Sequence, residues 1–213
     1  MELVLAGVHL YEFDIGLSDI LLGILCLYFL IVLLRRQAHR SASLIFFWLT
    51  ISAFSGAIFH FFFPLKTETF GWLFTWSIVA ISIGIIIFWT LQFLLWKIHI
   101  APVYQWIIVF GYQWLFLFHF FFMSYSYPGI IMFYAPVIIF LWVYWIWKYV
   151  FTKKLYYLML FIWILLSICA GIVQLTHFSL HDTYLTYNTV YHIIQWFGIF
   201  WIYYFFLHEN YEW

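Results

Sequence analysis

The sequence predicts an all-α, polytopic membrane protein with seven transmembrane helices. Of its 213 residues, 68% are hydrophobic and 8% are charged, whereas soluble domains carry about 25% charged residues. The apolar runs reach about 20 residues, the length at which a helix crosses a hydrocarbon core of about 30 Å. They are apolar on all sides, whereas the strands of a membrane barrel alternate. Eight Lys and Arg balance eight Asp and Glu, so no basic face for a nucleic-acid partner is expected.

Short polar or Pro- and Gly-containing separators divide these runs. In chain order the separators read RRQAHRS, PLKTET, KIHIAP, SYSYP, FTKK and HFSLHDTYLTY. We therefore expect one domain, spanning 1–213, with helices near 17–34, 43–63, 70–95, 103–123, 129–150, 155–177 and 186–207.

The basic residues fall almost entirely on one side of this arrangement. Seven of the eight Lys and Arg residues lie at the first, third and fifth connections, and Lys66 lies on the other side. The positive-inside rule then places the N-terminus outside and the C-terminus in the cytoplasm. The seven are Arg35, Arg36, Arg40, Lys97, Lys148, Lys153 and Lys154.

This orientation puts titratable side chains at similar depths on different helices. Asp19 lies near the outer end of the first helix, His60 near that of the second, and His192 about one and a half turns below that of the seventh. Ionisable groups inside a membrane are costly, so they usually mark functional sites. Alternatively, the two imidazoles only join helices by hydrogen bonds.

Helical spacing groups further polar residues on common faces. Asn188, His192 and Gln195 follow at i, i+4 and i+7 in the seventh helix, which predicts a polar stripe facing the bundle. Asn188 and Gln195 could either join helices or support a site.

Two further faces belong to the first two helices. In the first helix Glu12, Gly16, Asp19 and Gly23 share a face, and Gly56 lies one turn before His60 in the second. Glu12 is either a solvated loop acid or part of the site.

Imidazoles and a carboxylate in an apolar pocket form a ligand set for Zn²⁺. His60 and His192 would supply two ligands, and Asp19, His177 or His181 the third, with His181 preferred to His177. Zinc would lower the pKa of water toward about 7, and an Asp19 that is not a ligand could orient the water or carry its proton.

Three segments together carry a family resemblance. Glu12 followed by Ser18 and Asp19, GAIFHFF around His60, and YNTVYHIIQ around His192 are similar to motifs of an uncharacterised family of bacterial seven-helix membrane proteins. That family is related to the superfamily of alkaline ceramidases and progestin/adipoQ receptors. The resemblance implies a metal between the second and seventh helices, hydrolysis of lipid amides or esters, and a place in the bacterial inner membrane.

On this basis Asp19 and Asn188 are the expected catalytic residues, and Ser18, Gln195 and Glu12 are expected to support the cofactor. The chain departs from the better-studied relatives at three places. Gly56 stands where they carry Ser, Asn188 stands where they carry a second His, and residues 70–95 contain no acid. Asp19 could replace the missing acid if the first, second and seventh helices are neighbours.

The sequence therefore predicts a zinc-dependent intramembrane hydrolase acting on a lipid amide or ester at the outer leaflet. Its expected partners are membrane lipids and a lipid substrate or ligand, and its oligomeric state is left open. A non-catalytic lipid or sterol binder and a bis-histidine haem protein using His60 and His192 are the alternatives. Imidazole rings more than about 10 Å apart could not share a metal bound at roughly 2 Å by each.

Overall fold

The computed structural model describes residues 3–5, 8–63, 69–123, 127–181 and 185–209. Seven helices within these residues are long and apolar enough to cross a membrane, which confirms the predicted fold class. Their bounds are α1 Phe13–Arg35, α2 Arg40–Phe62, α3 Phe70–Lys97, α4 Pro102–Phe118, α5 Tyr127–Thr152, α6 Leu155–Thr176 and α7 Tyr187–Glu209. A π-helical turn, His119–Met123, continues α4.

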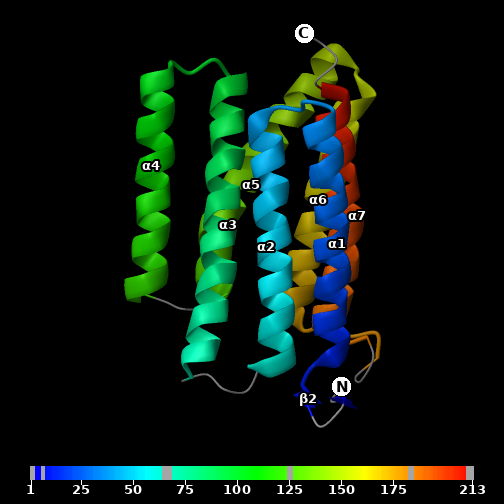
Figure 1. Ribbon diagram of the computed structural model, residues 1–213. Coiled ribbons are helices and arrows are strands. Elements are labelled where there is room, and N and C mark those ends of the chain that lie inside the picture. The colour runs from blue at the N-terminus through cyan, green and yellow to red at the C-terminus, as the bar shows by residue number, and fades with distance from the viewer. Residues whose placement is uncertain (1–2, 6–7, 64–68, 124–126, 182–184, 210–213) are drawn as a thin grey trace.

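Six of the helices form a closed ring and α4 lies outside it (Figure 1). Going around the ring, α1 contacts α2, α2 contacts α3, α3 contacts α5, α5 contacts α6, α6 contacts α7, and α7 returns to α1. The helix α4 packs against α3 on the outer side. The first, second and seventh helices are therefore neighbours, as the replacement of the missing acid by Asp19 requires.

The chain before α1 forms a small antiparallel hairpin that the sequence analysis did not predict. Strand β1 (Leu3–Leu5) pairs with β2 (Val8–Leu10), and β2 contacts α2. We call the end of the bundle where this hairpin lies the hairpin end. The opposite end, with Arg35, Arg36, Arg40 and Lys97, is called the basic end.

The helix α1 begins four residues earlier than expected, at Phe13 instead of residue 17. The apolar run that predicted this helix begins at residue 17, because the segment before it contains Glu12 and Asp14. Acidic groups in the first turn of a helix are stabilised by its dipole, and Asp14 also accepts a hydrogen bond from Thr189 of α7. These interactions allow the polar segment to continue the helix.

Aromatic side chains fill the ring toward the basic end. Phe29 of α1 stacks on Tyr203 of α7 with ring centroids 3.9 Å apart, and Trp145 of α5 packs against Phe205. The carboxylate of Glu209 at the end of α7 is paired with the ammonium group of Lys97 at the end of α3. This packing leaves the open interior space at the hairpin end.

Candidate metal centre

One face of α1 points at α2 along much of its length. A Cβ atom added at Gly16 or Gly23 would meet the ring of Phe61 or Phe54, both on α2. Glu12 and Asp19, on the same face, contact His60. The shared face expected from the spacing is therefore the α1–α2 interface, and its two glycines let the helices approach closely.

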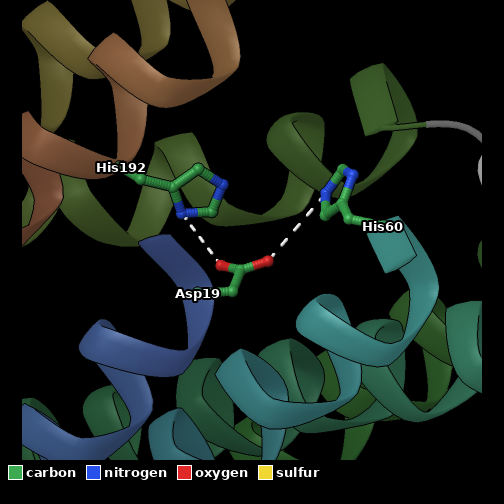
Figure 2. Close-up of side chains that lie close together, drawn as sticks. All are labelled: Asp19, His60 and His192. Atoms are coloured by element: carbon green, nitrogen blue, oxygen red, sulfur yellow. Dashed lines mark ion pairs between the residues drawn. The ribbon is translucent and has the colours of Figure 1, made fainter. Parts of the chain in front are cut away.

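Asp19 lies between two imidazole rings that come from different helices (Figure 2). Its Oδ1 is 2.9 Å from Nδ1 of His192 on α7, and its Oδ2 is 3.9 Å from Nε2 of His60 on α2. The centroids of the two rings are 6.4 Å apart, well inside the separation that would exclude a shared metal. Asp19 itself is buried. Residues far apart in the chain thus converge at the hairpin end.

These three side chains could hold a metal ion, because one ligand atom from each lies within 4.8 Å of the others. Ligands of a zinc ion, each bound at roughly 2 Å, lie at most about 4 Å apart, so a small movement suffices. Nδ1 of His192 is buried and makes no well-directed hydrogen bond within the described residues, although Asp19 Oδ1 is close. His192 Nδ1 and Asp19 Oδ1 are thus close together without a well-directed hydrogen bond between them, and a cation bound between them would give both atoms a partner.

Gly56 gives the carboxylate of Asp19 its space. A Cβ atom at this position would lie 2.7 Å from Asp19 Oδ2, a distance that requires the carboxylate to move. The space beside Gly56 is therefore filled by the acid of α1.

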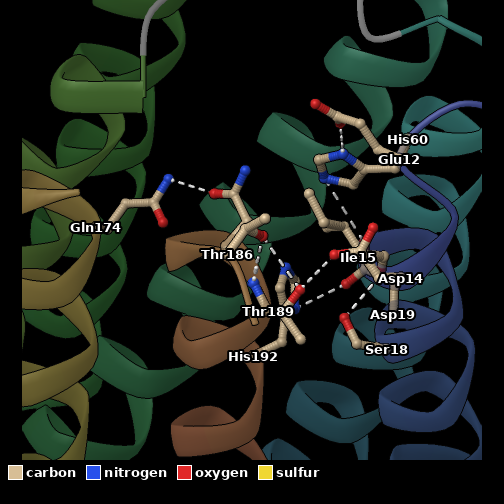
Figure 3. A network of polar contacts seen from close by, with 11 residues as sticks. Glu12, Asp14, Ile15, Ser18, Asp19, His60, Gln174, Thr186, Thr189 and His192 are labelled. Atoms are coloured by element: carbon tan, nitrogen blue, oxygen red, sulfur yellow. Dashed lines mark hydrogen bonds and ion pairs between the residues drawn. The ribbon is translucent and has the colours of Figure 1, made fainter. Parts of the chain in front are cut away.

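Glu12 reaches the other nitrogen of His60. Its Oε2 lies 2.6 Å from His60 Nδ1 (Figure 3), and its side chain is partly exposed. The imidazole is thus contacted by a carboxylate at each nitrogen, one from the first residue before α1 and one from its second turn. Glu12 is not simply a solvated loop acid.

We call Asp19, His60 and His192 together the metal group, after the ion that they could hold. A cavity of about 290 Å³ opens beside this group and is lined by α1, α2, α3, α6 and α7. His60, His192 and Asp19 lie in its wall. Leu22, Ile83 and other aliphatic and aromatic side chains make most of the remaining surface. A pocket of this composition fits a largely apolar ligand with one polar region.

The expected polar stripe of α7 lines the same cavity. Asn188 Oδ1 accepts a hydrogen bond of 3.0 Å from Gln174 of α6, and Gln195 Nε2 donates to the hydroxyl of Tyr191. The sequence analysis gave neither Tyr191 nor Gln174 a role. Only their helical spacing from Asn188 and His177 could have indicated them.

Three expected residues lie apart from the metal group. Ser18 is buried, and its hydroxyl donates to the carbonyl of Ile15 in its own helix. His177 ends α6 in a left-handed conformation and packs on Tyr187. His181 is exposed and its backbone pairs with Leu185. The structure therefore brings neither His177 nor His181 to the group, and Asp19 is the third candidate ligand.

Asp14 and Thr189 form a contact that the sequence analysis missed. The hydroxyl of Thr189 donates to Asp14 Oδ2 at 2.9 Å, and Thr186 lies 3.2 Å from Thr189 (Figure 3). The contact joins α1 to α7 beside the metal group. Nothing in the local sequence around either residue indicates this partner, because the two are distant in the chain.

The seven helices and the buried group define a class, an integral multi-pass membrane protein with a candidate metal site between α1, α2 and α7. Residues 15–208 match a family of unknown function (DUF6962), and the chain belongs to this family. No curated protein and no solved structure matches the chain.

Proposed function

We propose that the protein is a zinc-dependent intramembrane hydrolase of lipid amides or esters. The observation that carries the proposal is the convergence of Asp19, His60 and His192 in the wall of a mostly apolar cavity. Two imidazoles and one carboxylate are a donor set of catalytic zinc sites. The resemblance to the superfamily of alkaline ceramidases and progestin/adipoQ receptors supports the same chemistry.

The residues of the chain suit the proposed roles. Asp19, His60 and His192 would hold the metal, which supplies a Lewis acid and lowers the pKa of water. Asn188 accepts a hydrogen bond from Gln174 at its Oδ1, and its amide NH₂ has no partner among the described residues. Since Asn188 lies one turn from His192 on the same face, its NH₂ can donate to an acyl carbonyl oxygen. The apolar wall accommodates part of an acyl chain.

The location follows from the charge distribution. The basic end carries most of the Lys and Arg residues, so we place it in the cytoplasm and the metal group toward the outer leaflet of a bacterial inner membrane. Membrane lipids would then reach the cavity as substrate or ligand.

The geometry favours the hydrolase over the haem protein. A bis-histidine haem needs the porphyrin plane between its two imidazoles, and here the carboxylate of Asp19 lies between the rings and contacts both (Figure 2). The non-catalytic lipid or sterol binder uses the same cavity, and turnover distinguishes it from the hydrolase.

The test is elemental analysis of the purified protein together with hydrolysis assays on vesicles that contain an N-acyl lipid or the matching ester. Wild type is expected to carry stoichiometric zinc and to release fatty acid from one of them. Asp19→Asn and His192→Gln should lose both properties while remaining monodisperse, and His181→Gln, an exposed control, should keep both. Protein that folds without binding zinc, or carries iron, contradicts the proposal. Zinc binding without turnover of either lipid favours the lipid binder.

A further inference from the structure

We infer that Glu12 is a positioning residue that holds His60 with Nε2 turned toward the metal. The inference rests on the proposed metal site, and it assigns Glu12 to the orientation of a ligand instead of to the metal itself. It follows from two independent observations, the contacts of the His60 ring and the backbone conformation of Glu12.

The contacts define which nitrogen of His60 is available. Glu12 Oε2 lies 2.6 Å from Nδ1, while Nε2 lies 3.9 Å from Asp19 Oδ2. A carboxylate accepts but does not donate, so in the neutral imidazole, the form that binds a metal, the contact with Glu12 places the ring proton on Nδ1. Nε2 then carries the free lone pair on the side of Asp19. A carboxylate that fixes a metal-binding histidine in this way is a recurrent feature of metal sites.

The backbone of Glu12 is in an unusual conformation for its position. Among the residues that the structure describes, five non-glycine residues have positive φ. Four of them, Gln37, His99, Lys153 and His177, follow the ends of helices, where the left-handed conformation is common. Glu12 is the exception, because it precedes α1 with φ 35° and ψ 46°. Residues at this position normally adopt the β region and cap the helix with their side chain.

Glu12 does neither, since its side chain makes no capping hydrogen bond and contacts His60 instead. The residue before it is fastened to α2, because the amide of Tyr11 donates to the carbonyl of Phe61, next to His60 in the chain. The strained conformation therefore turns the carboxylate toward the imidazole. Strain of this kind persists where the surroundings impose it, commonly at functional sites.

The experiment distinguishes the effect of losing the Glu12 carboxylate from the effect of relieving the strained backbone. Glu12→Ala and Glu12→Gly both remove the carboxylate, but glycine adopts positive φ without penalty. The Gly variant should therefore melt at a higher temperature than the Ala variant. Both should bind zinc about 10- to 100-fold more weakly than wild type in a chelator competition.

Glu12→Gln, which keeps an acceptor, should retain part of the affinity. His181→Gln, a change at an exposed position away from Asp19, His60 and His192, should bind zinc like wild type.

The tautomer of His60 provides a readout that needs no metal. In ¹⁵N NMR spectra of metal-free protein, with the His60 signal assigned from a His60→Gln variant, wild type should show the Nδ1–H form and Glu12→Ala a mixture. Recovery of zinc affinity in Glu12→Gly, or an unchanged tautomer in Glu12→Ala, would overturn the inference. Wild type that binds no zinc but shows the Nδ1–H form contradicts the proposed function and leaves the orienting contact established.

Discussion

At the scale of single residues, Asp19 joins the two imidazoles of the candidate site, because its carboxylate lies close to both. Its depth, and those of His60 and His192, could be predicted from the sequence, since each position follows from counting residues along an apolar run. The partner of each nitrogen could not be predicted in this way. The partner of each nitrogen depends on side-chain directions and on the backbone conformation of Glu12, and neither can be derived from the periodicity of a helix.

We predict that Gly56→Ala weakens zinc binding by displacing Asp19. The new methyl group would lie 2.7 Å from Asp19 Oδ2, so the carboxylate must move, and disturbed ligand orientation typically costs about tenfold or more in affinity. The affinity can be measured by competition with a chelator.

The matched control for this change is Gly171→Ala in α6. A Cβ atom there meets nothing within 4 Å, and alanine favours a helix over glycine, so zinc affinity should be unchanged and the melting temperature equal or higher. A Gly56→Ala protein with the affinity of wild type would show that the carboxylate is free to move without loss of the site.

At the scale of elements, the existence and order of the seven helices could be read from apolar runs, and their ends were less certain. The start of α1 was misplaced because Asp14 has its stabilising partner on α7, far along the chain. The hairpin of β1 and β2 was missed for another reason, because strands of three residues are too short to show a period. The start of α1 thus depends on a contact with a distant segment, whereas the hairpin leaves no pattern in the sequence.

We predict that the hydrogen bond between Asp14 and Thr189 contributes to the attachment of α1 to α7. In a double-mutant cycle of Asp14→Ala and Thr189→Val, the coupling in the free energy of unfolding should be about 0.6 kcal/mol and at most about 1.7 kcal/mol, the average and the maximum for hydrogen bonds between membrane helices. Unfolding in mixed micelles measures it.

Thr176→Val serves as the comparison for this pair. The hydroxyl of Thr176 is exposed and donates to the carbonyl of Ile172 in its own helix, so its removal should show no coupling to Asp14→Ala. Equal coupling for both threonines would mean that the contact between α1 and α7 carries no specific energy.

At the scale of the whole molecule, the separation of the basic end from the metal group is the main feature of the architecture. We predict that the basic end faces the cytoplasm. Alkaline phosphatase, active only after export, should therefore be inactive as a C-terminal fusion, whereas a fluorescent protein at the same place should fluoresce. The reverse pattern would place the metal group at the inner leaflet. Exchange of the arginines Arg35, Arg36 and Arg40 for Gln should make the orientation mixed.

The contact of one imidazole with Asp19 of α1 and with Glu12, the residue before α1, also restricts how the bundle can move. Glu12 and Asp19 are seven residues apart, about 10 Å along a helix axis, and they contact opposite nitrogens of His60. A piston-like shift of α1 against α2 would break both contacts together. The cavity is therefore bounded on this side by two helices held in one register, while α3 lines it with Trp76 and aliphatic side chains.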